Sequence, residues 1–452
     1  MDIKNLHKVY FIGIGGIGMS ALARYFNERQ VVVSGYDRVS TELTCEMESE
    51  GIRIHYEDDI SLMDKTAELV IYTPAIPEDH AELNFCRKNH YEVVKRSDVL
   101  QAITRNLYAI TVAGSHGKTT ISTLIAHILR SSGFGCNAFL GGTSLNYNTN
   151  YWSSENNVAV IEADEYDRSF LKLSPDIAIL TAMDPDHLDI YGTAEAMEEA
   201  FIQYTANIRE GGLLVYKYGL KRSNELKASR IIQYSLENPK SEIYAEDICK
   251  SEDGYRFKII EGEWILDETD LHGGGLHNVE NTVAAVCVAH QLGIAPAAIK
   301  KAVAGFRGVK RRFEVIIRTP EIVFIDDYAH HPEELKAMIN GAKSLYPQKP
   351  CTVIFQPHLY SRTRDLAGQF ADSLDLADKV ILLPIYPARE LPIAGVSSAS
   401  ISRLMKKNEV SLMDKMQVID WLKLHTVKLL ITCGAGDIDQ LISPIKQILE
   451  KK

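Results

Sequence analysis

Two glycine-rich segments of this chain have the residue types that hold phosphate groups. One is Gly13-Ile14-Gly15-Gly16-Ile17-Gly18 and the other is Gly114-Ser115-His116-Gly117-Lys118-Thr119-Thr120, and each directly follows an apolar run typical of a β-strand. Backbone N–H groups in such loops, together with the N-terminus of the following helix, attract phosphate oxygens. Only the second segment adds a lysine and a hydroxyl, which suit a triphosphate with Mg²⁺. The two segments therefore predict ATP chemistry on a separately held, nucleotide-linked substrate.

The second segment departs from the strict Gly-x₄-Gly-Lys-[Ser/Thr] pattern, because Val112 stands where the first glycine belongs. Its physical parts are nevertheless present. We expect Lys118 to lie against the β- and γ-phosphates and the Thr119 hydroxyl to bind Mg²⁺. The residues expected to bind the nucleotide are Gly114, Ser115, His116, Gly117, Lys118, Thr119 and Thr120. A helix should follow, because the next apolar residues have helical spacing: Ile121, Leu124, Ile125, Ile128 and Leu129.

The first segment has the glycine spacing of a dinucleotide-binding loop. Asp37 follows at the end of the next predicted strand, where a carboxylate can hold a ribose hydroxyl. The residues expected to bind this ligand are Gly13, Gly15, Gly16, Ile17, Gly18 and Asp37. The spacing does not separate NAD from another diphosphate, and a tight turn without any ligand stays open as an alternative.

Acidic residues follow two later apolar runs, as Mg²⁺ chemistry requires. Glu162-Ala163-Asp164-Glu165 closes one run, and Asp184-Pro185-Asp186-His187-Leu188-Asp189 follows another. Mg²⁺ takes few protein ligands, since phosphates and waters complete its coordination. We therefore assign Thr119 and Glu162 to a first ion. His187 is a candidate ligand for a second ion or a substrate phosphate; the alternative is a helix N-terminus capped by acids.

Short β-branched runs alternate with helical periodicity along the whole chain, which predicts α/β domains with parallel sheets. Residues 213–275 form a strand-rich excursion. We place domain boundaries near Thr104 and Arg312. The predicted strands are Val9–Ile12, Val31–Ser34, Leu69–Tyr72, Ala109–Val112, Val158–Ile161, Ile177–Leu180, Ile322–Ile325, Thr352–Phe355, Val380–Leu383 and Leu429–Thr432.

Composition narrows the class of protein. A chain of 452 residues with 46% apolar residues suits two to four domains. The net charge of −11 argues against a nucleic-acid partner, which needs clustered lysine and arginine. Seven cysteines without a Cys-x-x-Cys pair suit the reduced thiols of a cytoplasmic protein, and we expect neither a signal segment nor a membrane span.

Six motifs in a fixed order make the chain resemble the Mur ligase family, over essentially its whole length. They are Gly-Ser-His-Gly-Lys-Thr-Thr, Glu-Ala-Asp-Glu-Tyr-Asp, Asp-Pro-Asp-His-Leu-Asp, His277-Asn278-Val279-Glu280-Asn281, Arg311-Arg312-Phe313-Glu314 and Asp326-Asp327-Tyr328-Ala329-His330-His331-Pro332. The opening glycine segment and Gln356-Pro357-His358-Leu359-Tyr360-Ser361-Arg362-Thr363-Arg364 point to the member that uses L-alanine.

The resemblance implies three domains and an ATP-dependent ligase. The domains would be a Rossmann-like UDP-substrate domain (1–104), a central P-loop ATPase domain with a parallel sheet (105–312) and a Rossmann-like C-terminal domain that closes over amino acid and ATP (313–452). The enzyme would join L-alanine to the lactyl carboxylate of UDP-N-acetylmuramate through an acyl phosphate, in peptidoglycan precursor synthesis. The nearest alternative attaches a recycled tripeptide to the same UDP-sugar. A monomer or weak homo-oligomer is expected.

The resemblance also implies roles for individual residues. Lys118 and Arg312 would neutralise the γ-phosphate, Thr119 and Glu162 would hold one Mg²⁺, and His187 would reach a second. The remaining assignments are His277, Asn278 and Asn281 at the adenine, Asp327 at the ATP ribose, and Tyr328, His330 and Arg362 at the muramoyl carboxylate or alanine.

Some of these residues have simpler explanations. His330 precedes a predicted helix that opens near Pro332, so it can serve as a cap, and Arg362 and Arg364 can be solvated charges at a helix start. Segments 386–389 and 434–437 are candidate walls of the amino-acid pocket.

One departure from the family concerns a lysine carbamate that sibling ligases place about fifteen residues beyond the motif histidine. Ile202 stands near that place, and no lysine lies between Lys172 and Lys217. Water, ATP oxygens and His187 would then complete the coordination of the second ion.

Two functions from other classes fit part of the pattern. A nicotinamide oxidoreductase would explain the first glycine segment and Asp37, but it leaves Lys118 and its carboxylates without a role. A non-catalytic P-loop switch is disfavoured, because the chain has no Asn-Lys-x-Asp motif for guanine.

Overall fold

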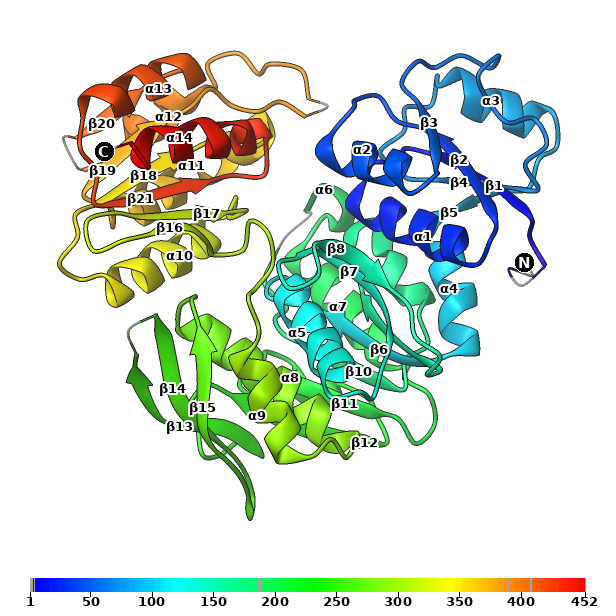
Figure 1. Cartoon of the computed structure of the whole chain (residues 1–452), viewed down its shortest axis with the longest axis horizontal. Helices are drawn as coiled ribbons and strands as arrows, with labels where there is room; N and C mark the ends of the chain where they lie inside the picture. The colour runs from blue at the N-terminus through cyan, green and yellow to red at the C-terminus, as the bar shows by residue number, and fades with distance from the viewer. Residues whose placement is uncertain are drawn as a thin grey trace. The chain divides into compact units, whose positions relative to one another are not determined.

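The computed structural model describes residue 3 and residues 5–185, 188–251, 253–388, 390–406 and 409–451. The chain contains both strands and helices, and the strands form three sheets, as Figure 1 shows. By compactness the chain divides into two units. Unit 1 contains residues 1–246, 259–267 and 280–306, and unit 2 contains residues 247–258, 268–279 and 307–452. The mixed α/β architecture with parallel sheets is confirmed.

The first sheet has five parallel strands in the order β3-β2-β1-β4-β5. The helix after the first glycine segment, α1, buries Met19, Leu22, Ala23 and Phe26, which have the spacing of one helix face. The elements are β1 (Lys8–Ile12), α1 (Ile17–Glu28), β2 (Val32–Tyr36), α2 (Glu42–Ser49), β3 (Arg53–His55), β4 (Leu69–Tyr72), α3 (Ala81–Lys88), β5 (Val93–Lys95) and α4 (Arg96–Asn106).

The second sheet has ten strands in the order β15-β14-β13-β12-β11-β10-β6-β9-β7-β8. β6 pairs in parallel with both β9 and β10, so the strand that leads into the second phosphate loop lies inside the sheet. The elements from β6 to α7 are β6 (Tyr108–Ala113), α5 (Lys118–Ser131), β7 (Asn137–Ser144), β8 (Thr149–Trp152), β9 (Val158–Glu162), the 3₁₀ segment η1 (Tyr166–Lys172), β10 (Ile177–Leu180), α6 (Leu188–Tyr191) and α7 (Ala194–Thr205).

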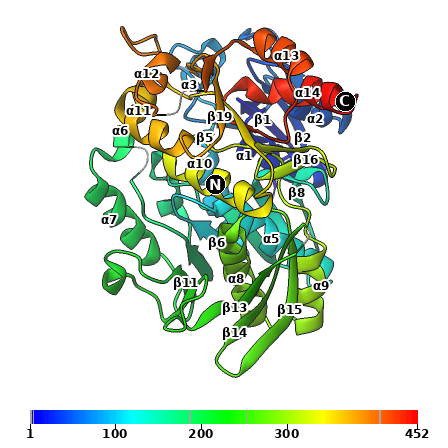
Figure 2. The same ribbon diagram turned by 90° about the vertical axis from the view of Figure 1, so that its left-hand side faces the viewer.

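The strand-rich excursion predicted for residues 213–275 is confirmed as β11 to β15. Its elements and the two helices that follow are β11 (Leu213–Lys217), η2 (Ser223–Glu225), β12 (Arg230–Ser235), β13 (Ile243–Lys250), β14 (Gly254–Glu261), β15 (Trp264–His272), α8 (Leu276–Gln291) and α9 (Pro296–Ala304). Helix α5 packs on β6, β7 and β9 and against α9 (Figure 2). This packing buries the apolar face predicted for α5.

The third sheet, in unit 2, has six strands in the order β16-β17-β21-β18-β19-β20, and all its pairs are parallel except β16 with β17. Both faces are covered: Val323 and Ile325 of β17 face one core, whereas Phe324 faces the other. A sheet buried on both faces needs uninterrupted apolar strands, which the sequence has here. The elements are β16 (Glu314–Arg318), β17 (Val323–Asp327), α10 (Pro332–Leu345), β18 (Cys351–Phe355), α11 (Tyr360–Leu374), β19 (Lys379–Leu382), α12 (Ser398–Ser402), β20 (Val410–Leu412), α13 (Lys415–Leu424), β21 (Leu429–Cys433), η3 (Asp437–Leu441) and α14 (Ile442–Leu449).

All ten predicted strands are present, to within one or two residues at their ends. The boundary expected near Thr104 falls inside α4, which continues to Asn106. Among the described residues, no helix combines the length and apolar character needed to cross a lipid bilayer. The seven cysteines all lie among the described residues, and none of them forms a disulfide there.

Candidate functional site: two phosphate loops on one acidic segment

The second phosphate loop connects β6 to α5, and its glycines adopt backbone conformations that suit a close approach. Gly114 has φ +126° and Gly117 has φ +79°, both in the region that side chains disfavour. A Cβ at Gly114 would collide with the Thr181 hydroxyl and the Ala182 backbone. Gly117 is the residue before Lys118, so the loop turns directly into the N-terminus of α5. The N–H of Ser115, which the sequence assigns to phosphate, donates to the Ala182 carbonyl at 3.2 Å.

Lys118 is held inside this loop by an acid that sequence reasoning did not assign. Its ammonium donates to Glu165 Oε1 at 2.8 Å and to the Gly114 carbonyl at 2.7 Å. The side chains of Lys118 and Glu165 are 14% and 2% exposed, so the pair is largely withdrawn from water. Burial works against the ammonium charge, but the carboxylates of Glu165, Glu162 and Asp164 outweigh it and raise the pKa of Lys118. Lys118 is therefore a cation at neutral pH.

The two residues assigned to Mg²⁺ lie side by side. Thr119 Oγ1 donates to Glu162, 2.9 Å from Oε2 and 3.1 Å from Oε1. Glu162 Oε2 also accepts the N–H of Gly141 at 3.1 Å, which fixes the carboxylate. Two oxygens bound to Mg²⁺ at about 2.1 Å and at right angles are about 3.0 Å apart. The residues therefore fit a magnesium ion, with the threonine hydroxyl turned to offer its lone pair.

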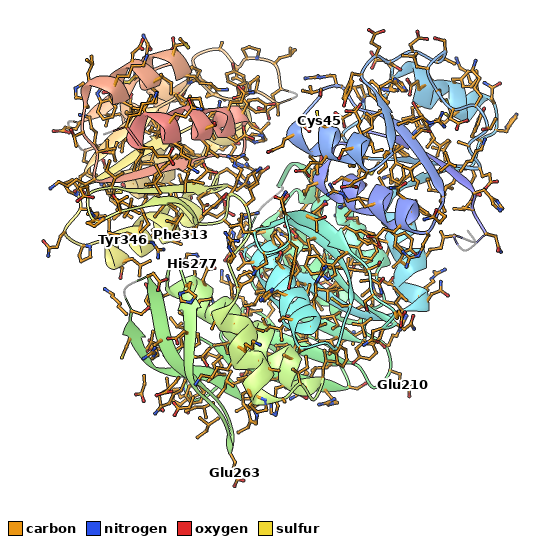
Figure 3. All side chains as sticks on the ribbon, in the orientation of Figure 1. Cys45, Glu210, Glu263, His277, Phe313 and Tyr346 are labelled. Carbon is orange, nitrogen blue, oxygen red and sulfur yellow. The ribbon has the colours of Figure 1, made fainter. Side chains whose placement is uncertain are left out.

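Residues expected near the adenine fall on the N-terminal part of α8. The side-chain oxygen of Asn281 is the nearest atom to a Cβ built on Gly117, at 2.8 Å, so Asn281 borders the phosphate loop within unit 1. His277 and Asn278 belong to unit 2, beside the glycines that precede α8; Figure 3 labels His277. Burial lowers the pKa of His277 to about 4, so its imidazole is neutral at physiological pH.

The first glycine segment forms the turn between β1 and α1. Gly13 has φ +85°, and its N–H and that of Ile14 both donate to the Tyr36 carbonyl. Asp37 Oδ2 accepts the N–H of Gly15 at 2.8 Å. Asp37, expected at a ribose, thus also braces the loop that precedes it. A Cβ at Gly15 would lie 2.9 Å from this carboxylate oxygen, so glycine is needed there.

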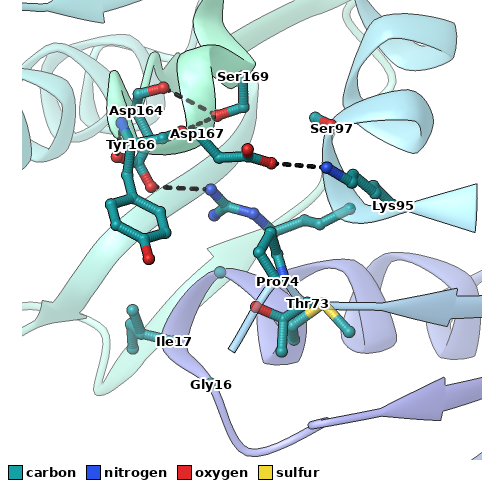
Figure 4. Close-up of a pocket in the computed structure, with 13 residues that line it drawn as sticks. Gly16, Ile17, Thr73, Pro74, Lys95, Ser97, Asp164, Tyr166, Asp167 and Ser169 are labelled. Atoms are coloured by element: carbon teal, nitrogen blue, oxygen red, sulfur yellow. Dashed lines mark hydrogen bonds and ion pairs between the residues drawn. The ribbon is translucent and has the colours of Figure 1, made fainter. Parts of the chain in front are cut away.

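A pocket of about 200 Å³ opens at the N-terminus of α1, within unit 1. Residues 16–19 and 73–74 line it, together with Lys95, Arg96, Ser97, Asp164, Tyr166, Asp167 and Ser169. Figure 4 shows Lys95 reaching Asp167, a contact of 2.8 Å, and Arg96 pairs with Asp164 at 3.0 Å. The pocket therefore combines a helix N-terminus with two cations, which is favourable for a diphosphate.

Arg312 lies just before β16, and Asp327 is the last residue of β17, the strand that pairs with β16. The Arg312 guanidinium lies 5.1 Å from the centre of the Tyr328 ring, a cation–π arrangement. Asp327 Oδ2 accepts the N–H of Phe313 at 2.6 Å, and Oδ1 accepts that of Ala329 at 2.7 Å. Burial raises the pKa of Asp327 to about 6, although Arg312 and these N–H groups oppose the shift. Asp327 thus fixes the N–H of the residue that follows Arg312 and the N–H of the residue that follows Tyr328.

His330 lies in a row of rings with Tyr328, His358 and Tyr386. Its ring centre is 5.4 Å from that of Tyr328 and 6.2 Å from that of His358, and His358 stacks on Tyr386 at 5.8 Å. His330 Nδ1 is 3.0 Å from the Tyr328 carbonyl, which only accepts, so Nδ1 carries the proton.

Of the two adjacent histidines, His330 and His331, only His331 caps the helix that follows. The helix after them, α10, begins at Pro332 and has His331, not His330, at its N-cap. The N–H groups of both histidines donate to Glu334 Oε2. Arg362 lies in the first turn of α11, half-buried.

The two segments expected to form walls of the amino-acid pocket, 386–389 and 434–437, each contribute a residue to one pocket of unit 2. Tyr386 and Asp437 line a pocket of about 460 Å³ with Gln356, Ile385, Pro387, Lys415 and others. Gln356 donates to Asp437 Oδ1 at 2.8 Å. His187 and Arg389 lie outside the described residues.

Sequence reasoning missed four residues that the fold brings to these loops. They are Glu165, Lys95, Arg96 and His358. Two signals were available: Glu165 is the third acid of a motif at a strand end, and Lys95-Arg96 is a pair of cations at a junction where a strand ends and a helix begins.

The fold and these two loops define the class of the protein. Three family models match it: "Mur ligase family, catalytic domain" over residues 8–108, "Mur ligase middle domain" over residues 112–289, and "Mur ligase, glutamate ligase domain" over residues 311–437. The chain belongs to the Mur ligase family.

Its relatives narrow the comparison to one branch of that family. The chain is similar, at 46% identity over the full length of both proteins, to the UDP-N-acetylmuramate–L-alanine ligase of Phocaeicola vulgatus. It is 45% identical to the enzyme of the same name from Porphyromonas gingivalis, over 98% of this chain and 99% of that one. The solved UDP-N-acetylmuramate-alanine ligase of Thermotoga maritima matches with a TM-score of 0.81 and 28% identity, over 98% of each chain. A murein peptide ligase from Psychrobacter arcticus, 21% identical over 97% of this chain and 99% of its own, shares the fold with a TM-score of 0.72.

Proposed function

We propose that this chain is an ATP-dependent amide ligase that joins L-alanine to the lactyl carboxylate of UDP-N-acetylmuramate, in peptidoglycan precursor synthesis. The observation that carries the proposal is the position of the two phosphate loops in unit 1, on either side of residues 162–167. One loop has the lysine, hydroxyl and carboxylate of an ATP site, and the other has a pocket suited to a diphosphate. Full-length relatives at 45–46% identity, named for L-alanine, support the choice of substrates.

The reaction has two steps. An oxygen of the lactyl carboxylate attacks the γ-phosphorus of ATP, the bond to the bridging oxygen breaks, and ADP leaves. The amine of L-alanine then attacks the acyl phosphate, loses a proton, and expels phosphate from the tetrahedral intermediate. In the first step an anion approaches a polyanion, so cations at the reacting groups are needed. Lys118 is proposed to leave Glu165 and neutralise the γ-phosphate.

Mg²⁺ is proposed to bind Thr119 and Glu162, with His187 as the candidate for a second ion. When bound, the metal shields the phosphate charge and orients the γ-phosphate. The spacing of the Thr119 and Glu162 oxygens supports the first assignment. The remaining loop residues, Gly114 to Thr120, are proposed to surround the triphosphate, with Asn281, His277 and Asn278 on the adenine side and Asp327 at the ribose.

The C-terminal residues are proposed to complete the site. Arg312 would pair with the γ-phosphate, and Tyr328, His330 and Arg362 would face the muramoyl carboxylate or alanine. The row of rings through Tyr328 and His330 supports a shared role. The turn of residues 13–18 and Asp37 is proposed to hold the uridine diphosphate, because the adjacent pocket contains two cations.

The domain division 1–104, 105–312 and 313–452 stays a proposal, supported by the three sheets and by the three ranges of family similarity. A cytoplasmic location and a monomeric or weakly associating chain are likewise proposed. Cysteines without disulfides, as found among the described residues, are compatible with that location.

An ADP-release assay tests the function directly. Purified protein receives ATP, Mg²⁺ and UDP-N-acetylmuramate with L-alanine, glycine, L-serine or the tripeptide in turn. The expected result is ADP release and a new amide product with L-alanine, confirmed by mass spectrometry. Turnover with the tripeptide and none with L-alanine would favour the recycling ligase instead, and NADH binding without any UDP-sugar binding would favour an oxidoreductase.

A further inference from the structure

One acidic segment, Glu162–Asp167, contacts both phosphate sites. Its carboxylates are divided between the two sites. Glu162 and Glu165 turn toward the second phosphate loop, where they contact Thr119 and Lys118. Asp164 and Asp167 turn toward the pocket at the first loop, where they pair with Arg96 and Lys95.

The pairs on the pocket side occupy the groups that a diphosphate would use. Figure 4 shows Asp164 and Asp167 on the wall opposite Gly16 and Ile17, with Lys95 joined to Asp167. A Cβ added to Gly18 would collide with the Arg96 guanidinium, so this cation lies directly against the first glycine loop. All four side chains of these two pairs are between 21% and 37% exposed, so an incoming anion can reach them. Asp167 and Asp164 neutralise the two cations, so a phosphate that binds Lys95 and Arg96 has to displace these carboxylates.

The backbone of the segment is strained where it leaves the pocket. Asp167 (φ 54°, ψ 21°) and Arg168 (φ 54°, ψ 24°) are consecutive non-glycine residues in the left-handed region. Such conformations persist only where surrounding contacts hold them. The contacts include the Lys95 pair on Asp167 and hydrogen bonds from Ser169 Oγ and Phe170 N to the Asp164 carbonyl. Loss of the Lys95 pair removes one of the restraints on this turn.

The other side of the segment is anchored at Glu165. Its carboxylate binds Lys118, and its carbonyl accepts the Tyr191 hydroxyl at 2.7 Å and the N–H of Arg168 at 3.0 Å. Glu165 therefore connects Lys118 to the strained turn, because Asp167 and Arg168 follow it by two and three residues. When an ATP phosphate takes Lys118, the segment loses its restraint on that side.

We propose that Glu162–Asp167 couples the two phosphate sites, because its acids compete with the nucleotides for Lys118, Lys95 and Arg96. Release at one site removes part of the restraint that keeps the segment closed at the other, so ATP and the UDP-sugar bind with positive cooperativity. Asp164 and Asp167 are positioning residues here, since they act through the two cations. This inference rests on the proposed function, in that it takes the pocket ligand to be the UDP-sugar.

Calorimetry on the full chain tests the coupling. The dissociation constant for UDP-N-acetylmuramate is measured with and without a non-hydrolysable ATP analogue and Mg²⁺. For the unmodified protein we expect the analogue to tighten binding by about five-fold or more, a typical coupling between sites. For the double variant Asp164→Asn, Asp167→Asn we expect UDP-N-acetylmuramate to bind tightly already without the analogue. Adding the analogue should then leave the dissociation constant almost unchanged. Asparagine keeps one side-chain oxygen that accepts hydrogen bonds, replaces the other with an NH₂ group, and removes the competing charge.

A matched control removes two carboxylates elsewhere in unit 1. Glu199→Gln, Glu225→Gln deletes two of the three acids that pair with the half-buried Arg222, leaves Glu198 in place, and changes the net charge equally. Its coupling should equal that of the unmodified protein. Thermal unfolding verifies that each variant is folded; if the double variant is not, Asp167→Asn alone should show half of the effect, through Lys95.

Two outcomes separate the inference from the proposed function. If the UDP-sugar binds and the double variant keeps the full gain from the ATP analogue, or binds the UDP-sugar more weakly, the coupling is wrong and the function stands. If the unmodified protein binds ATP but no UDP-sugar, the proposed function itself is wrong, and with it the inference.

Discussion

The ammonium of Lys118 lies 2.8 Å from Oε1 of Glu165, a carboxylate that is 2% exposed. The two residues are 47 positions apart in sequence, and they meet because β6 and β9 are neighbours whose carboxyl ends share one edge of the sheet. A buried lysine without a partner would tend to lose its proton. Glu165 therefore keeps Lys118 charged until a phosphate replaces the carboxylate.

Replacing Lys118 by alanine should abolish most of the turnover. We expect the rate of ADP release to fall at least ~10³-fold, because the missing charge stabilises the transferred phosphoryl group in the transition state. The UDP-sugar should still bind, since its pocket uses Lys95 and Arg96 instead. Steady-state assays and calorimetry measure the two effects. The control is Lys221→Ala, at an exposed lysine, which should change neither; near-normal turnover of purified Lys118→Ala would exclude the phosphoryl-transfer role.

Gly15→Ala should weaken the UDP-sugar site selectively. The added Cβ would lie 2.9 Å from Asp37 Oδ2 and 2.8 Å from Thr44 Cγ2, so the turn that presents its N–H groups has to move. We expect the KM for UDP-N-acetylmuramate to rise about ten-fold or more, a loss of about one hydrogen bond to a charged group, with the KM for ATP little changed. Gly368→Ala, where a Cβ meets open space, is the matched control. A rise in the ATP constant alone would contradict the assignment of the first loop to the UDP-sugar.

Glu82 should make the stability of the first sheet depend on pH. Its side chain is fully buried and accepts the Tyr10 hydroxyl at 2.5 Å, and burial raises its pKa to about 7. The folded state therefore holds a proton that the unfolded state releases near pH 4.5, so the free energy of unfolding should fall as the pH rises from about 5 to 7. The full effect is about 3 kcal/mol at most.

Urea unfolding at pH 5, 6, 7 and 8 measures the Glu82 effect. Glu82→Gln imitates the protonated acid, so this variant should lose that slope and be the more stable protein at pH 8. An equally steep slope in Glu82→Gln would assign the pH dependence to other groups.

Features set by residues close together in the sequence could be predicted from it, whereas contacts between residues far apart in the sequence could not. Glycine conformations and the helices that follow them are local, so both phosphate loops and the inward face of α5 could be predicted. The pairs Lys118–Glu165 and Arg96–Asp164 could not, because they join residues 47 and 68 positions apart, and their partners depend on strand order. Strands β3, β5 and β20 have three residues each, too few to establish a two-residue period.

Activity should be indifferent to bicarbonate. A lysine carbamate needs a neutral lysine that can reach the metal, and the place where sibling ligases have one falls near Ile202, on α7. Ile202 is 6% exposed and belongs to an apolar core with Phe201 and Tyr204, where a charged carbamate would have to be desolvated. Turnover should therefore be equal in CO₂-depleted buffer and in buffer with added bicarbonate. A sibling ligase that has the lysine provides the positive control. If depletion abolished turnover and bicarbonate restored it, a lysine elsewhere would serve the metal, and the alignment of His187 with the family histidine would have to be revised.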